Sequence, residues 1–438
     1  MSPVLFNLFI NSLVNEVKAL DIGVDINGEK ICILLYGDDV ILLAEKESDL
    51  QLLLDILHCW CQRNKMSVNL NKSKVMHFRN KSVQRTAYVF KYDGNEIDIV
   101  DQYLYLGLLL TEYLDYELMA KNVSKSANRA LGLLIVKSKQ FGGFSFETFT
   151  KLYDTLVWSV ISYGSAIWGF KEYTCINAVQ NRAMRFFMGV GKYTPNDAVQ
   201  GDMGWKPVCV RQWSDIFRHW SRLLKMDNDR LNFKVFEWSF NEASRNRKNW
   251  CFKVKKKLEE LQINEFFRID EPICKTDLTL IENTIIDRFI LDWKQRLLSY
   301  DHGKKLRTYK CFKNEYCTEN YILCHMPKRY RSAFAKFRCG VAPLRIETGR
   351  YERLQVNERV CFNCNNMIED EEHVLLHCPL YSSERFMLFE YARMFYQDFD
   401  VLTDKDKLIH ILQDSNMCWM SAKICYLILL KRNSLLYT

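Results

Sequence analysis

Two adjacent carboxylates, Asp38 and Asp39, carry the clearest chemistry in the sequence. They belong to the tetrapeptide Tyr36-Gly37-Asp38-Asp39, which lies between apolar runs of strand length at 31–35 and 40–44. This pattern predicts a β-hairpin whose turn holds the two carboxylates side by side. Mg²⁺ prefers oxygen ligands, and nucleotidyl transfer uses two such ions, so the pair is a candidate half of a metal site. The alternative is an ordinary polar turn, because Gly and Asp are common turn residues.

A second group of potential ligands lies near the C-terminus. Cys361, Cys364, His373 and Cys378 have the spacing C-x2-C-x8-H-x4-C. Zn²⁺ favours four tetrahedral sulfur or nitrogen ligands, and four protein ligands make a structural rather than a catalytic site. His377 is an alternative to His373, although neighbouring residues such as His377 and Cys378 rarely reach one ion together. The alternative to a zinc site is that these four residues are reduced and bind no metal, in a chain that is rich in Cys.

Two basic segments suit a nucleic-acid partner. Residues 245–257 contain no acidic residue, and Trp250 and Phe252 lie among their cations: Arg245, Arg247, Lys248, Lys253, Lys255, Lys256 and Lys257. Lysine side chains bind the phosphates along a nucleic-acid strand, and a Trp ring stacks on its bases. The candidate contacts are therefore Lys255, Lys256, Lys257 and Trp250. A solvated helix or linker explains the same composition. The second basic segment is 328–359, in which Arg338 is the candidate contact.

The elements that must position these residues follow from periodicity. Residues 4–20 have the pattern of an amphipathic helix. A second helix is expected from Ser48 as its N-cap, with Gln51 completing a capping box and an apolar face between Leu50 and Cys61. A strand is expected at 75–78, and Asp93-Gly94 predicts a hairpin turn. From 116 to about 240 the pattern is helical.

Four motifs in order carry a family resemblance. They are Ser2-Pro3-Val4-Leu5-Phe6-Asn7-Leu8-Phe9-Ile10-Asn11, the Tyr36–Asp39 motif, Asn69-Leu70-Asn71-Lys72-Ser73-Lys74-Val75-Met76, and Tyr105-Leu106-Gly107. This order resembles the end of motif B and motifs C, D and E of the reverse transcriptases of non-LTR retrotransposons. Gly37 stands where that family usually has Ala, and Gly also fits the turn.

The resemblance implies an RNA-directed DNA polymerase with RNA template and DNA primer strand as partners. Asp38 and Asp39 would be its Mg²⁺ ligands, and Lys72 a candidate general acid for pyrophosphate, with Lys74 as its rival. A solvent-facing turn is the ordinary explanation for both lysines. Tyr105–Gly107 would lie near the primer end. The Cys/His segment resembles the zinc knuckle that follows the polymerase in these elements.

The expected fold class is α+β: a truncated reverse-transcriptase palm with a Tyr-Gly-Asp-Asp hairpin, a mainly helical thumb and a small zinc knuckle. The expected segments are a partial palm at 1–115, a thumb-like domain at 116–240, a basic helical connector at 241–325, a basic approach with the knuckle at 326–385, and a helical tail at 386–438.

In the resembled family, the partner carboxylate of motif A and the fingers lie upstream of motif B, and neither has a counterpart in this sequence. A two-metal site needs carboxylates from separate strands. We therefore expect these residues to be inactive as a polymerase by themselves. The alternative is a non-catalytic RNA- or DNA-binding zinc-knuckle protein.

Composition sets the remaining expectations. The 438 residues are 48% hydrophobic and 26% charged, with a net charge of +8, the sign expected of a phosphate-backbone binder. No signal peptide and no membrane-spanning run is recognisable. The 16 Cys are read as reduced thiols and metal ligands of an intracellular, nuclear or cytoplasmic protein that is not secreted. The sequence does not set the oligomeric state.

Overall fold

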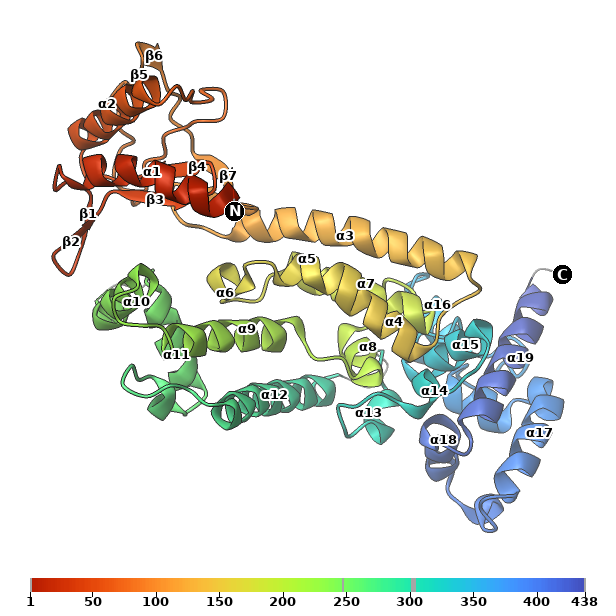
Figure 1. The fold of residues 1–438 in the computed structure, drawn as a ribbon. Helices are drawn as coiled ribbons and strands as arrows, with labels where there is room; N and C mark the ends of the chain where they lie inside the picture. Colours follow the sequence, from red (N-terminus) through yellow and green to blue (C-terminus); the bar gives the residue numbers. More distant parts are fainter. Residues whose placement is uncertain (1, 246–247, 301–304, 437–438) are drawn as a thin grey trace. The chain divides into compact units, whose positions relative to one another are not determined.

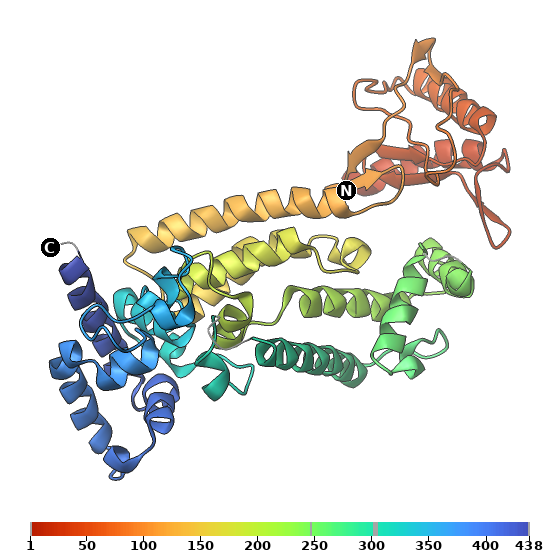
Figure 2. The same ribbon diagram turned by 180° about the vertical axis from the view of Figure 1, so that it is seen from behind.

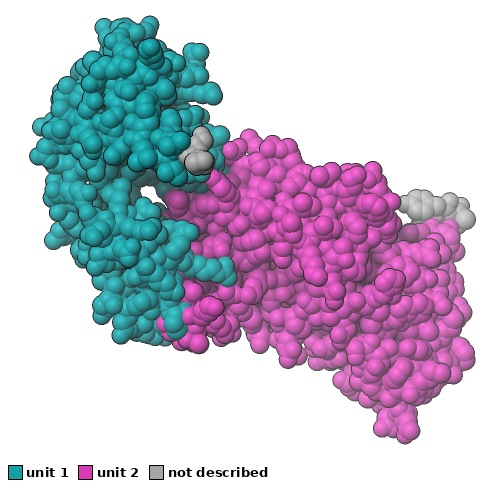
Figure 3. Space-filling view, in the orientation of Figure 1, with its two compact units in different colours: residues 1–120, 218–274 teal, residues 121–217, 275–438 magenta. Residues whose placement is uncertain are grey.

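The computed structural model describes residues 2–245, 248–300 and 305–436. By packing, the chain divides into two compact units, which Figure 3 colours separately. Unit 1 comprises Met1–Ala120 and Arg218–Cys274, and unit 2 comprises Lys121–Phe217 and Lys275–Thr438. Segment 218–274 therefore packs with the N-terminal residues although it is distant from them in sequence. This division differs from the five consecutive segments expected above, whose assignment to thumb, connector and knuckle stays a prediction.

Unit 1 contains the strands of the fold. They pair as two-stranded antiparallel sheets, each formed by strands adjacent in sequence. The pairs are β1 (Val24–Ile26) with β2 (Glu29–Ile31), β3 (Ile33–Tyr36) with β4 (Asp39–Leu42), β5 (Lys91–Tyr92) with β6 (Asn95–Glu96), and β7 (Gln102–Tyr105) with β8 (Leu108–Thr111). Helices α1 (Ser2–Lys18) and α2 (Glu47–Arg63) accompany them (Figure 1). The mixed composition agrees with the expected α+β class.

The core of this N-terminal part lies between α1, α2 and the β3–β4 hairpin. Leu13 of α1 and Leu53 of α2 are fully buried in it, and Ile33 joins them from β3. The Trp60 indole on α2 donates a hydrogen bond of 2.9 Å to Ser12 Oγ on α1. The apolar face predicted for α2 is thus confirmed, and it packs in one core with Ile33 of the β3–β4 hairpin.

Two local predictions need correction. Helix α2 begins at Glu47 with Lys46 as N-cap and without a side-chain cap, so the Ser48 capping box is wrong. The Gln51 side chain instead exchanges hydrogen bonds of 2.8 and 2.9 Å with the Lys91 backbone, which attaches β5 to α2. The strand expected at 75–78 is reduced to one bridge between Val75 and Ile99.

The second segment of unit 1 is helical. It contains the end of α9 (Val208–Leu223), α10 (Leu231–Asn241) and α11 (Trp250–Glu260). An aromatic cluster holds these helices together: the Trp220 ring meets Phe236 at 4.9 Å and Trp250 at 5.6 Å between centroids. Lys234 on α10 forms an ion pair of 2.6 Å with Glu29 on β2, which links the segment to the N-terminal part.

Unit 2 is built from helices (Figures 1 and 2). They are α3 (Glu117–Gln140), α4 (Phe146–Tyr153), α5 (Ser159–Ser162), α6 (Ser165–Trp168), α7 (Thr174–Met188), α8 (Asn196–Met203), most of α9, α12 (Lys275–Leu298), α13 (Tyr309–Phe312), α14 (Asn320–Leu323), α15 (Lys328–Arg338), α16 (Arg345–Thr348), α17 (Ser382–Arg393), α18 (Asp404–Gln413) and α19 (Cys418–Leu436). Helix α15 packs against α19, and α17 and α18 also contact α19. Among the described residues, no helix is long and apolar enough to cross a membrane.

Short 3-10 and π-helical turns occur among the helices of both units. The π turns are η1 (Asp154–Trp158) and η5 (His373–His377), and the 3-10 turns are η2 (Glu242–Ser244), η3 (Asn264–Phe266), η4 (Val356–Glu358), η6 (Pro379–Tyr381) and η7 (Phe399–Val401). Turn η5 carries both histidines of the candidate metal segment.

Candidate metal centres and nucleic-acid interface

The predicted carboxylate hairpin is present. Tyr36 of β3 pairs with Asp39 of β4, so Gly37 and Asp38 form a two-residue turn. Gly37 has a φ of +59°. A positive φ at the first turn position is a feature of the primed hairpin turns, which match the right-handed twist of the strands and favour Gly there. The turn leaves both Asp38 and Asp39 exposed to solvent, where an ion can reach them.

The motif around Tyr105 lies beside this hairpin. Strands β7 and β8 form a second hairpin, whose turn residues Leu106 and Gly107 have φ values of +45° and +78°. Burial raises the pKa of the Tyr105 hydroxyl, and the negative charge of Asp39 raises it further. Because a charge acts in this way only over a short distance, Tyr105 lies near Asp39. The structure therefore brings together two motifs separated by some 65 residues of sequence.

The carboxylate pair has no third partner in the part of the chain that the structure describes. No other Asp, Glu, His or Cys joins Asp38 and Asp39 in a group of three potential ligands. Adjacent carboxylates on one hairpin fit part of a Mg²⁺ cage, whereas a two-metal site needs further oxygens from a separate strand. Asp38 and Asp39 by themselves would therefore supply only part of such a site.

The two candidate lysines have different surroundings. Lys74 Nζ forms an ion pair of 2.6 Å with Asp98, so this carboxylate already balances the charge of Lys74. Lys72 lies exposed in the preceding turn, and its backbone carbonyl accepts a hydrogen bond of 2.8 Å from the Tyr103 hydroxyl of β7. The geometry therefore ties Lys72, rather than Lys74, to the hairpin that carries Tyr105.

Cys361, Cys364, His373 and Cys378 converge in unit 2. All their potential ligand atoms lie within 4.8 Å of one another. Cys378 Sγ lies 3.8 Å from the sulfurs of both Cys361 and Cys364. Two sulfurs bound to one Zn²⁺ at about 2.3 Å are about 3.8 Å apart at a tetrahedral angle. The sulfur positions thus match the edges of a zinc tetrahedron.

A short hairpin and a helical turn create this convergence. Val360 pairs with Ile368, and the Cys361 amide donates a 2.8 Å hydrogen bond to the Met367 carbonyl. Asn365, with a φ of +55°, allows the chain to reverse within this hairpin after Cys364. The last potential ligand, Cys378, directly follows η5, and its amide donates a hydrogen bond of 2.8 Å to the carbonyl of His373, the first residue of that turn.

The two histidines of η5 have different surroundings: His373 is buried, and His377 faces solvent. His373 is 3% exposed, and neither ring nitrogen has a hydrogen-bond partner. Burial lowers the pKa of His373, which favours the neutral imidazole that binds metals. His377 is exposed, and its Nε2 lies 3.3 Å from Asp404 Oδ2. An orphaned buried imidazole beside three thiols fits a metal, so the geometry favours His373 over His377 as the fourth ligand.

Buried acids anchor the ligand loop to neighbouring elements. Glu369 accepts two hydrogen bonds of 2.8 Å from Arg432 on α19. Glu371 accepts bonds of 2.5 and 2.7 Å from one nitrogen of Arg307. Our sequence reasoning missed these residues. The available signals were the acidic run between Cys364 and His373 and the Lys431–Arg432 pair that follows the apolar stretch of α19.

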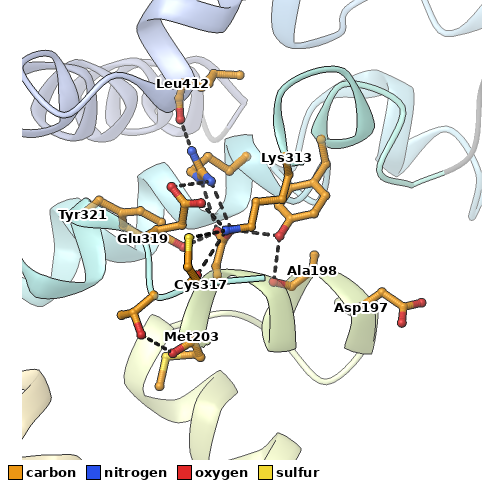
Figure 4. Close-up of polar contacts among 12 residues, drawn as sticks. Asp197, Ala198, Met203, Lys313, Cys317, Glu319, Tyr321 and Leu412 are labelled. Carbon is orange, nitrogen blue, oxygen red and sulfur yellow. Dashed lines mark hydrogen bonds and ion pairs between the residues drawn. The ribbon is translucent and has the colours of Figure 1, made fainter. Parts of the chain in front are cut away.

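The structure contradicts the predicted nucleic-acid contact of Arg338. Its side chain is 1% exposed and forms hydrogen bonds of 3.0 and 3.1 Å with the fully buried Asp202. Glu319 forms an ion pair of 3.1 Å with the same guanidinium, and the Leu412 carbonyl accepts a hydrogen bond from it (Figure 4). The Tyr321 hydroxyl donates to Asp202 at 2.7 Å. No part of this guanidinium faces solvent, so Arg338 joins α8, α14, α15 and α18 internally.

Other cations of the second basic segment are also used internally. Arg331 Nε donates a bond of 3.1 Å to the Phe187 carbonyl, and Arg359 donates to the Ile346 carbonyl at 3.0 Å. Both side chains are buried. Three of the nine Lys and Arg residues in 328–359 are therefore buried in unit 2, whereas Lys328, Arg329, Arg350 and Arg353 are exposed.

The first basic segment keeps its lysines at the surface of α11. Cys251, Val254 and Leu258 form the buried face, Lys256 is exposed, and Lys255 and Lys257 are half-buried. Lys255 Nζ lies 5.6 Å from the Phe267 ring centroid, and Lys257 Nζ lies 3.5 Å from Glu260. Trp250 is half-buried, and its ring stacks on Trp220 at an interplanar angle of 19°. One expected member, Arg247, lies outside the described residues.

Comparisons with known proteins find a family match over the region that contains the Asp38–Asp39 hairpin. Residues 1–110 match the family model of the reverse transcriptase (RNA-dependent DNA polymerase). A probable RNA-directed DNA polymerase from transposon BS of Drosophila melanogaster is 26% identical over 202 residues, covering 44% of this chain and 22% of that protein. A putative uncharacterized transposon-derived protein of Caenorhabditis elegans is 21% identical over 148 residues, covering 34% of this chain and 52% of that protein. The chain thus spans about a fifth and about half of these relatives. Residues 1–110 thus resemble a reverse transcriptase domain, and the chain is similar to transposon-derived proteins, one of which is described as a probable RNA-directed DNA polymerase.

Proposed function

We propose that the chain is the C-terminal part of a non-LTR retrotransposon reverse transcriptase, comprising the end of the palm, a helical thumb and a zinc knuckle. The observation that carries the proposal is the Asp38–Asp39 hairpin beside Tyr105, inside the region that matches the family. The reaction is RNA-directed DNA polymerisation, and the partners are an RNA template and a DNA primer strand.

In this function Asp38 and Asp39 would hold Mg²⁺, which stabilises the attacking and leaving oxygens of phosphoryl transfer. Exposure at the turn lets both carboxylates reach ions bound to substrate phosphates. Lys72 is the proposed proton donor to the departing pyrophosphate, since Lys74 is paired with Asp98. The remaining metal ligands must come from a separate segment, and these 438 residues do not polymerise by themselves.

The Cys/His group is proposed to bind one structural Zn²⁺ through Cys361, Cys364, His373 and Cys378. Support comes from the 3.8 Å sulfur separations and from the unpartnered nitrogens of His373. Four protein ligands leave no open position, so the ion would order the loop and take no part in chemistry.

A second candidate is a non-catalytic RNA- or DNA-binding zinc-knuckle protein. The lack of a third carboxylate near Asp38 and Asp39, among the described residues, favours it for this polypeptide. In both functions nucleic acid would contact the lysines of α11, namely Lys255, Lys256 and Lys257.

Primer extension on an RNA template with Mg²⁺ separates the candidates. The chain alone should incorporate no nucleotide, while it binds the template–primer duplex. A segment of a relative that contains the fingers and the motif A carboxylate, added in trans, should restore extension in the parent. Asp38→Asn should prevent this restoration. Extension by the chain alone that survives Asp38→Asn would contradict the proposed metal site, and binding without any restored extension would favour the second candidate.

A further inference from the structure

The turn that supplies two zinc ligands also presents donors on its outer side. Glu372 precedes His373, and His377 precedes Cys378; the first residue of each pair is exposed and the second is buried. Asp404, the first residue of α18, faces this outer side with Oδ2 at 3.3 Å from His377 Nε2. Potential ligand atoms of Glu372, His377 and Asp404 all lie within 4.8 Å of one another.

This donor set suits a divalent transition ion. Imidazole nitrogen and carboxylate oxygens bind Zn²⁺ at about 2.0–2.1 Å, which places two ligands of a tetrahedron about 3.3–3.4 Å apart. The 3.3 Å separation of His377 and Asp404 matches this edge. Glu372 is exposed, so a change of its rotamer brings its oxygen nearer at small cost.

A simple ion pair between His377 and Asp404 does not account for the third donor. Glu372 adds a second carboxylate to the same place, and Asp370, which accepts a hydrogen bond from the His373 amide, adds negative charge nearby. Converging like charges repel one another unless a cation lies between them. A divalent ion bound to the three donors offsets this repulsion.

We propose that Glu372, His377 and Asp404 form a second, solvent-accessible site for a borderline divalent ion such as Zn²⁺ or Co²⁺. Three protein ligands leave at least one position to water, in contrast to the closed Cys/His site. The two sites share the backbone of η5, because residues 372 and 377 are bonded to the inner ligands 373 and 378. The inner ion therefore preorganises the outer site, and the proposal rests on the structural zinc site proposed above.

Co²⁺ titration of the metal-free chain under reducing conditions tests this arrangement. Thiolate-bound tetrahedral Co²⁺ gives sulfur-to-metal charge-transfer bands, whereas Co²⁺ bound by imidazole and carboxylate gives weak visible bands only. Equilibrium dialysis should count two Co²⁺ per parent chain, one of them with thiolate bands. His377→Ala and Asp404→Asn should each retain the thiolate bands and lose one Co²⁺. Cys364→Ser should lose both ions.

The matched control is His410→Ala, which removes another histidine, on α18, that lies 4.0 Å from Asp414. It should retain two ions. One Co²⁺ in the parent, with thiolate bands, would overturn the outer site and leave the inner site intact. Two ions in His377→Ala would overturn the outer ligand set. A parent without thiolate bands would overturn the proposed structural zinc site and the coupled outer site with it.

Discussion

Arg432 of α19 donates two hydrogen bonds of 2.8 Å to the carboxylate of Glu369, in the loop between Cys364 and His373. Both side chains are buried. Burial lowers the pKa of the Arg432 guanidinium, and the Glu369 carboxylate raises it. The net effect is a raised pKa. The guanidinium therefore keeps its charge, and the pair joins the candidate zinc loop to the last helix.

Glu369→Gln should destabilise the protein by about 3–5 kcal/mol, because it leaves the Arg432 charge buried without its counter-charge. Denaturant unfolding of the metal-loaded protein measures this loss. The matched control is Lys431→Met, the next residue of α19, whose partly exposed pair with Glu384 should be worth about 1 kcal/mol or less. Equal losses in the two variants would show that Glu369 does not anchor the loop.

Tightly held zinc should depend on the inner histidine. The purified chain should retain one Zn²⁺ after exhaustive dialysis, and Cys364→Ser or His373→Ala should lose it. His377→Ala should retain it, because that side chain faces Asp404 instead. Structural zinc contributes on the order of 10–16 kcal/mol of apparent binding energy, so the metal-free variants should also lose order in the 360–378 loop. Metal content by elemental analysis and amide exchange of this loop test both statements, and zinc loss in His377→Ala would reassign the ligand.

The buried Asp202–Arg338 pair should make unit 2 sensitive to acid. Burial alone would raise the pKa of Asp202, but the Arg338 charge and its hydrogen bonds hold it below the ordinary value of 3.8. A lowered folded-state pKa stabilises the protein above the unfolded-state pKa, and this stability is lost as pH falls toward the folded-state value. Unfolding free energy should therefore fall below about pH 4 by up to about 1.4 kcal/mol per pH unit for this group.

Asp202→Asn tests that assignment. It should be less stable than the parent at pH 7, since Arg338 then lacks a buried counter-charge, and its decline between about pH 4 and 2 should be shallower. Urea unfolding across this range measures both differences. Parallel curves for parent and variant would show that the acid sensitivity arises from other carboxylates.

Nucleic-acid binding should be electrostatic and should involve α11. Neutralising Lys255, Lys256 and Lys257 together should weaken RNA binding and flatten the decline of log affinity with log salt, because each released counterion contributes to that slope. A matched control neutralises Arg331, whose cation is buried against the Phe187 carbonyl. That variant should lose stability and keep the salt slope. Identical slopes in parent and triple variant would exclude these lysines from the interface.

Trp250→Ala alone would not test whether the Trp250 ring stacks on bases. Since its ring stacks on Trp220, Trp250→Ala should cost about 3–5 kcal/mol of stability, and reduced binding would then have two explanations. Trp250→Phe keeps an aromatic ring in the cluster. If Trp250 also stacks on bases, this variant should weaken single-strand binding more than duplex binding, at nearly unchanged stability.

The parts of the fold that were predictable depend on neighbours in sequence. The β3–β4 hairpin follows from Gly37 and its flanking apolar runs, and the buried face of α2 follows from a helical period between Leu53 and Cys61. The convergence of the four Cys/His ligands was implied by their spacing within 18 residues. Local patterns thus set local structure and the convergence of the Cys/His group.

The burial of charged residues was not predictable in the same way. Arg338 is separated from Asp202 by 136 residues, and Arg432 from Glu369 by 63. Composition shows an excess of cations in 328–359 but not which cations have buried acidic partners from distant helices. The mistaken assignment of Arg338 to nucleic acid follows from this, because a buried guanidinium and a phosphate-binding guanidinium look alike in sequence.

The turn residue Gly37 should be sensitive to a side chain. At a φ of +59°, Ala places Cβ against the backbone, which costs about 1–2 kcal/mol, although no other atom lies within 4 Å of that Cβ position. The cost of Gly37→Ala should therefore be purely conformational and confined to the hairpin. Gly37→Asn should cost less, since Asn tolerates the left-handed region. Amide exchange at Leu35 and Val40, which pair across the strands, should speed up in the Ala variant and less in the Asn variant. Because the resembled family usually carries Ala here, equal exchange in all three proteins would mean that the turn adopts another geometry at no cost. The positions of Asp38 and Asp39 would then not depend on the glycine.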